Sequence, residues 1–161
     1  MHIHIIMTSK PLARYPVLAL PCACAGLRRA ARAVTRVYDE ALRPSGLRVT
    51  QFSLMQVLAN ARAPLTQGTL GERLALDSTT LSRTLRPLER CGWIRAVPGP
   101  DRRERRLALT SAGRRQLERA SPHWERTQAR LRKQVGAARW KGLFAAFDLV
   151  TEAAQGAGQT S

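Results

Sequence analysis

Between residues 77 and 90 the sequence sorts leucines and arginines onto opposite sides of one helix. At about 100° per residue, its three leucines fall within about 40° of one another: Leu81, Leu85 and Leu88. The side about 140° to 200° away carries Thr79, Arg83, Arg86 and Arg90. Such a helix buries its leucines in a core and keeps guanidinium and hydroxyl groups in water. We therefore expect a surface helix with one apolar and one cationic face.

Helical periodicity and capping residues predict the elements that precede this helix. Residues 27–43 form an amphipathic helix, which a Pro-Ser-Gly sequence ends. Thr50 is expected to cap a second helix, and Thr66 a third, shorter one. Asp77 is expected to cap the surface helix, because a carboxylate accepts hydrogen bonds from the first free N–H groups. Cys91 and Gly92 then end it.

A β-hairpin is predicted after the surface helix. Residues 93–97 and 105–109 have the pattern of two strands, and Pro98-Gly99-Pro100-Asp101 forms the turn between them. Thr110 is expected to cap a long helix that runs to about residue 135, and a last helix carries Trp140 and Phe144. The chain is therefore expected to be mainly α, with one small β-hairpin.

The tip of this hairpin concentrates positive charge. Residues 101–106 read Asp-Arg-Arg-Glu-Arg-Arg. Four arginines on a protruding loop repel one another, and they are explained if they meet phosphate or a narrow, electronegative minor groove. Asp101 is placed to pair with Arg103 and to hold the loop in shape. A helix, a short helix, a turn, a surface helix and a basic hairpin form a winged helix-turn-helix.

The charge balance limits the partners that we expect. Lys and Arg number 27 against 11 for Asp and Glu, which gives a formal charge of +16. This imbalance favours nucleic acid or an anionic membrane surface. The sequence has no glycine-rich phosphate loop, no paired carboxylates and no Cys–His pair at recognisable spacing, so we expect no enzyme, no catalytic residue and no cofactor.

A basic RNA-binding or membrane-surface module is the alternative interpretation. RNA recognition usually stacks bases on aromatic side chains, and only 5% of this chain is aromatic. No segment reaches the roughly 18 apolar residues of a membrane span. The apolar face of helix 27–43 consists largely of Ala and Val, which favours packing on another helix over membrane contact.

Several motifs together resemble the MarR family of bacterial transcriptional regulators. They are residues 65–90, then Gly92-Trp93-Ile94, Asp101-Arg102-Arg103 and Leu109-Thr110-Ser111-Ala112-Gly113. The resemblance covers residues 22 to about 153. It implies a homodimer that binds a palindromic operator in double-stranded DNA, with the surface helix in the major groove and the hairpin in the minor groove. The cytoplasm is expected on other grounds, because three cysteines, an odd number, do not form a disulfide framework. Many members repress transcription and are released by small aromatic ligands, and some sense oxidants through cysteine.

The resemblance assigns roles to individual residues. Base recognition falls on the surface helix, at Ser78, Thr79, Ser82, Arg83 and Arg86. The β-hairpin of residues 93–109 is the wing, and its DNA contacts are assigned to Asp101, Arg102 and Arg103. Residues 49–111 would form the DNA-binding lobe, and residues 22–48 and 112–155 the dimerisation helices. Flexible ends are expected from the residues themselves, at 1–21 because of its three prolines and at 156–161 because of its small and polar residues.

Two sets of residues are candidates for receiving a signal. Phe52, Met55, His123 and Trp124 are expected to line a crevice that takes a flat aromatic ligand, although Phe52 and Trp124 are also explained as core residues. Cys22 and Cys24 precede the first helix, where the helix dipole favours thiolates, so they are candidate redox residues. They are also explained as small buried hydrophobic residues. We expect no metal site, and we expect Cys91 to fill the core.

Overall fold

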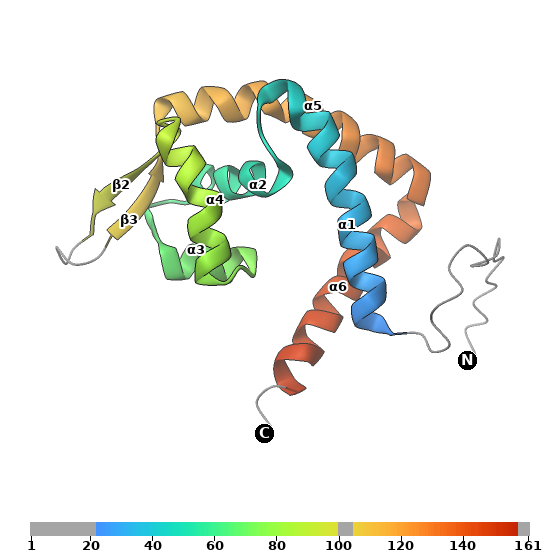
Figure 1. The fold of residues 1–161 in the computed structure, drawn as a ribbon. Coiled ribbons are helices and arrows are strands. Elements are labelled where there is room, and N and C mark those ends of the chain that lie inside the picture. Colours follow the sequence, from blue (N-terminus) through green and yellow to red (C-terminus); the bar gives the residue numbers. More distant parts are fainter. Residues whose placement is uncertain (1–21, 100–104, 158–161) are drawn as a thin grey trace, which may run out of the picture. The chain divides into compact units, whose positions relative to one another are not determined.

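A computed structural model of the protein describes residues 22–99 and 105–157 (Figure 1). The chain forms two compact units that divide within the first helix, between Arg36 and Val37. In chain order the elements are α1 (Ala23–Leu42), a 3-10 turn (Arg43–Ser45), α2 (Val49–Ala59), β1 (Leu65–Thr66), α3 (Gln67–Leu74), α4 (Ser78–Arg90), β2 (Ile94–Pro98), β3 (Arg105–Leu109), α5 (Ser111–Val135) and α6 (Ala137–Ala157). The described part of the first unit is the beginning of α1, and all other described elements belong to the second unit.

The core of the second unit draws on residues between the end of α1 and the first half of α5. Its buried apolar residues are Leu42, Leu47, Phe52, Leu54, Met55, Leu58, Leu70, Leu81, Leu85, Leu88, Ile94, Leu107, Leu109 and Ala120. The three leucines predicted for the apolar face of the surface helix are all in this set. Burial of one side of α4 therefore leaves its other side at the surface.

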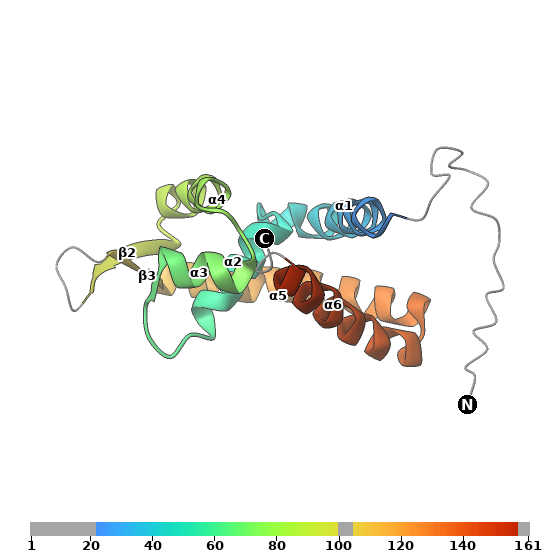
Figure 2. The ribbon, with the colours of Figure 1, turned by 90° about the horizontal axis from the view of Figure 1, so that it is seen from below.

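The sheet has one strand more than the sequence predicted. The strand order is β1-β3-β2, with both pairs antiparallel. The predicted hairpin is confirmed as β2 and β3, which pair from Ile94 opposite Leu109 to Pro98 opposite Arg105. The strand β1 pairs Leu65 with Leu107 and was not predicted, because two residues carry no periodicity of their own. In Figures 1 and 2 the hairpin projects beyond α3 and α4.

The predicted caps of three helices are confirmed. The backbone N–H of Thr69 donates to Thr66 Oγ1 over 3.1 Å at the start of α3. At the start of α5 the N–H of Gly113 donates to Thr110 Oγ1 over 3.0 Å. Asp77 caps α4 in the same way. Each cap satisfies a backbone donor that the first turn of a helix leaves unpaired.

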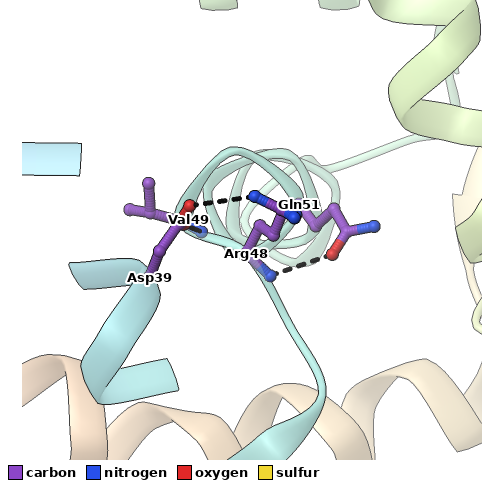
Figure 3. Close-up of polar contacts among 4 residues, drawn as sticks. All are labelled: Asp39, Arg48, Val49 and Gln51. Atoms are coloured by element: carbon purple, nitrogen blue, oxygen red, sulfur yellow. Dashed lines mark hydrogen bonds and ion pairs between the residues drawn. The ribbon is translucent and has the colours of Figure 1, made fainter. Parts of the chain in front are cut away.

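The prediction that Thr50 caps the second helix is wrong. The helix α2 begins at Val49, and the N–H of Arg48 donates to Gln51 Oε1 over 2.9 Å. The N–H of Val49 donates to Asp39 Oδ1 over 2.8 Å, so a side chain of α1 completes this cap, and Figure 3 shows Asp39 facing the start of α2. Because the acceptor lies ten residues earlier in the chain, the local sequence could not identify it.

The expectation that Cys91 fills the core is also wrong. Cys91 is exposed and forms the C-terminal cap of α4, with its N–H donating to the carbonyl of Pro87. Leu88 before it and Ile94 after it occupy the core, and the turn between them carries the Cys91 side chain outward. Among the described helices, none is long and apolar enough to cross a bilayer.

Candidate nucleic-acid interface

The helix α4 presents its predicted cationic side to solvent. Leu81, Leu85 and Leu88 are at most 2% exposed, whereas Thr79, Arg83, Arg86 and Arg90 are exposed. This arrangement agrees with the helical spacing of the sequence. The guanidinium groups can therefore reach a partner without any change in the core.

All five side chains assigned to base recognition lie together. They line one open hollow of about 390 Å³ on the surface of α4, formed by Ser78, Thr79, Ser82, Arg83 and Arg86. The group combines three hydroxyls with two guanidinium groups. Arginine can donate two hydrogen bonds to guanine O6 and N7, and hydroxyls can contact base edges or phosphates. The hollow thus carries the chemistry for reading a major groove.

The start of α4 is stabilised by Asp77. Its Oδ1 accepts from the N–H of Thr80 over 2.8 Å, and its Oδ2 accepts from the Thr80 hydroxyl over 2.6 Å. The Thr80 side-chain hydrogen bond, followed by the backbone bond, holds the pKa of the Asp77 carboxyl below its ordinary value. The Thr84 hydroxyl donates to the carbonyl of Thr80 over 2.9 Å. The hydroxyls of Thr80 and Thr84 therefore support the helix, and those of the hollow remain at its surface.

The end of α4 is joined to the hairpin by close contacts. The hydroxyl of Thr110 donates to the carbonyl of Gly92 over 2.7 Å and to that of Trp93 over 3.2 Å. A Cβ on Gly113 would lie 2.1 Å from the Trp93 carbonyl oxygen, so this approach requires glycine. These contacts explain physically why the Leu-Thr-Ser-Ala-Gly motif follows the hairpin.

One ion pair at the same joint could not be predicted from the sequence. Arg105 Nη2 lies 2.5 Å from Glu89 Oε1 and connects β3 to the last turn of α4. The two residues are 16 positions apart, and neither belongs to a local pattern that would identify the pair. Asp101, Arg102 and Arg103, which the sequence analysis assigns to the wing, lie outside the described residues.

Among the described residues, the four that were predicted to line a ligand crevice lie in different surroundings. Phe52 and Met55 have no exposed surface, and Phe52 stacks on Trp124 with ring centroids 5.8 Å apart. Trp124 lines a hollow of about 450 Å³ formed by α5 and the start of α6. His123 lines a separate hollow with residues of α1 and α5, where Arg126 Nη2 lies 3.1 Å from His123 Nδ1.

A buried tyrosine extends the aromatic stack. Tyr38 packs on Trp124 with ring centroids 6.5 Å apart, and its hydroxyl donates to Gln128 Oε1. Burial raises the pKa of Tyr38 above its ordinary value. The stack of Tyr38, Trp124 and Phe52 thus connects α1, α5 and α2 within the second unit.

The candidate redox cysteines lie in the first unit. Cys22 and Cys24 are free and exposed, rather than buried as small hydrophobic residues. Within the residues that the structure describes, no group of three or more His, Cys, Asp or Glu side chains could hold a metal ion.

Part of the chain is similar in sequence to known transcriptional regulators. The family model described as "MarR family" matches residues 45–104, from the turn before α2 to the hairpin tip. The uncharacterized HTH-type transcriptional regulator YwoH of Bacillus subtilis is 30% identical over 92 residues, which are 57% of this chain and 66% of YwoH.

Solved structures resemble nearly the whole fold. The M. tuberculosis transcriptional regulator MosR, crystallised in complex with DNA, is 39% identical with a TM-score of 0.72, and the match covers 83% of this chain and 98% of MosR. PcaV from Streptomyces coelicolor, in complex with its natural ligand, is 26% identical with a TM-score of 0.73 over 92% of this chain and 99% of PcaV. On its motifs, its winged helix-turn-helix fold and these matches, the chain belongs to the MarR family of transcriptional regulators.

Proposed function

We propose that this protein is a sequence-specific regulator that binds double-stranded DNA with α4 in the major groove. The observation that carries the proposal is that Ser78, Thr79, Ser82, Arg83 and Arg86 all line one hollow on the surface of α4, with Arg83 and Arg86 on the side away from the buried leucines. A rigid helix with its donors on one exposed face is what base reading requires. The protein would act by binding, in the cytoplasm, and not by catalysis.

The hairpin would contribute contacts to phosphate and the minor groove through Arg102 and Arg103, with Asp101 shaping the loop. The formal charge of +16 supports this role, because release of counterions from DNA drives such binding. The complex of MosR with DNA shows that a protein similar to this one binds DNA.

We further propose that two copies of the chain associate through α6. Within this helix Phe144, Phe147, Leu149 and Val150 are between 41% and 67% exposed. Exposed apolar side chains gathered on one helix favour burial against a second surface. A second copy is the occupant that fits best, because two α4 helices related by a twofold axis would match a palindromic operator.

Release from DNA would follow a chemical signal, either a small aromatic ligand or an oxidant. PcaV was crystallised with its natural ligand. In this chain Trp124 and His123 line separate hollows on α5 and are the accessible candidates for ligand contact. Phe52 would support Trp124 by stacking on it, and Met55 as part of the core against which Trp124 packs. The exposure of Cys22 and Cys24 supports the alternative of oxidation.

A footprint on the promoter of the protein's own gene tests the function directly. We expect protection of a palindrome whose half-sites lie about one helical turn of DNA apart. On that operator Arg83→Ala should weaken binding by about 1 to 3 kcal/mol, with a much smaller effect on random-sequence duplex.

Arg119→Ala is the matched control, because it removes an exposed cation from α5 and leaves α4 intact. It should leave the preference for operator over random DNA unchanged. An equal loss on both DNAs for Arg83→Ala would contradict a base-reading role. A membrane-surface module would instead bind anionic vesicles and protect no palindrome, and an RNA-binding module would prefer single-stranded RNA.

A further inference from the structure

The helix α4 contains a single acidic residue, Glu89, beside three arginines. At about 100° per residue Glu89 lies about 80° from Leu81, between the buried side and the cationic side. A carboxylate at the edge of a DNA-binding surface repels phosphate unless a cation neutralises it. The position of Glu89 therefore calls for a partner.

Arg105 supplies that partner from another element. Its Nη2 lies 2.5 Å from Glu89 Oε1, and the side chains are 55% and 27% exposed, respectively. Arg105 is the first residue of β3 and pairs with Pro98 across the hairpin. The ion pair thus connects the last turn of α4 to the end of the hairpin strands that lies next to their connecting loop.

Stability of the fold does not explain this pair. A half-exposed ion pair contributes little to stability. The joint between α4 and the hairpin is already held by Thr110, whose hydroxyl donates to the Gly92 carbonyl over 2.7 Å, and by the close packing of Gly113 on Trp93. The pair instead fixes the direction in which the Arg105 side chain points, and the carboxylate of Glu89 compensates its positive charge.

We propose that Glu89 is a positioning residue that holds Arg105 against α4 and keeps its charge away from the DNA phosphates. This inference rests on the proposed function. It follows that one arginine of the hairpin adds nothing to binding of arbitrary DNA, so that a larger share of the affinity depends on the bases read by α4. Glu89 would thereby raise the ratio of specific to non-specific affinity.

The slope of log K against log[salt] on random-sequence duplex DNA tests this inference, because it counts phosphate contacts. We would measure it by fluorescence anisotropy for the wild type, Glu89→Gln, Arg105→Gln and the double variant. Freeing Arg105 in Glu89→Gln should steepen the slope by about 0.9, equivalent to about a threefold greater loss of affinity between about 50 and about 200 mM salt. Arg105→Gln should keep the wild-type slope, and the double variant should return to it.

Glu118→Gln is the control, because it removes an exposed carboxylate from α5 and should not alter the slope. A role confined to the fold would change melting temperatures but not this slope. If Arg105→Gln alone lowered the slope by about 0.9, Arg105 would contact phosphate in the wild type and the inference would be wrong. An unchanged slope in Glu89→Gln would overturn it as well.

The same experiment separates the inference from the function on which it rests. If the wild type bound no duplex DNA at low salt, the proposed function would fail and the inference with it. If the wild type bound duplex DNA and the four slopes were equal, the inference alone would fail.

Discussion

Gly113→Ala is expected to destabilise the joint between the hairpin and α5. The added Cβ would lie 2.1 Å from the Trp93 carbonyl oxygen and 2.8 Å from Leu109 Cδ1, and the first of these atoms belongs to the backbone. Overpacking of this kind costs about 1 to 3 kcal/mol. Relief by movement of the hairpin would weaken the 3.0 Å hydrogen bond from Thr110 N–H to the Trp93 carbonyl, a further loss of about 0.5 to 1.5 kcal/mol.

The higher helix propensity of alanine offsets about 0.5 to 1 kcal/mol of that loss. We therefore expect the free energy of unfolding to fall by about 1 to 3 kcal/mol, measured by urea denaturation at fixed protein concentration. Gly68→Ala is the control, since a Cβ there meets only Thr66 Oγ1, at an ordinary 3.8 Å. The reasoning would be refuted if Gly113→Ala were as stable as Gly68→Ala. The Trp93 carbonyl would then be able to move away from the added Cβ without any loss of stability.

Three further predictions concern the cap, the dimer and the cysteines. The pKa of Asp77 is lower in the folded than in the unfolded protein, so the ionised carboxylate stabilises the fold. This contribution is fully present above the pKa that Asp77 has in the unfolded chain, and it is lost as the pH falls through the pKa that Asp77 has in the folded protein. Urea midpoints should show Asp77→Ala less stable than the wild type at neutral pH, with a gap that narrows in acid; a constant gap would contradict the assignment. Sedimentation should show that replacing Phe144 and Phe147 by Glu converts dimer to monomer, and a persisting dimer would place the interface elsewhere. Mild oxidant should release DNA from the wild type but not from a Cys22→Ser, Cys24→Ser double variant, and equal release from both would exclude these thiols as the sensor.

Most of the fold and the core of the candidate site could be predicted because their signals are local. A cap such as Thr66 or Thr110 accepts a hydrogen bond from three residues later, so both partners lie in one short stretch of sequence. The two faces of α4 follow from helical spacing alone, since core and solvent select opposite side chains at a period of 3.6 residues. The grouping of Arg83 and Arg86 in one hollow follows from the same spacing.

The features that were missed join residues from different elements. Asp39 completes the cap of α2, Leu65 begins a strand that exists only by pairing with Leu107, and Glu89 meets Arg105 across 16 positions. In the sequence, each of these residues looks like an ordinary surface or loop residue. Their hydrogen bonds and ion pair form only after packing of the core has brought the two partners together. The sequence by itself thus determined the helices, the N-terminal caps of α3, α4 and α5, and the cationic face of α4. Only the tertiary structure decided which side chains of separate elements meet, since distances between elements are set by the shared core and not by local spacing.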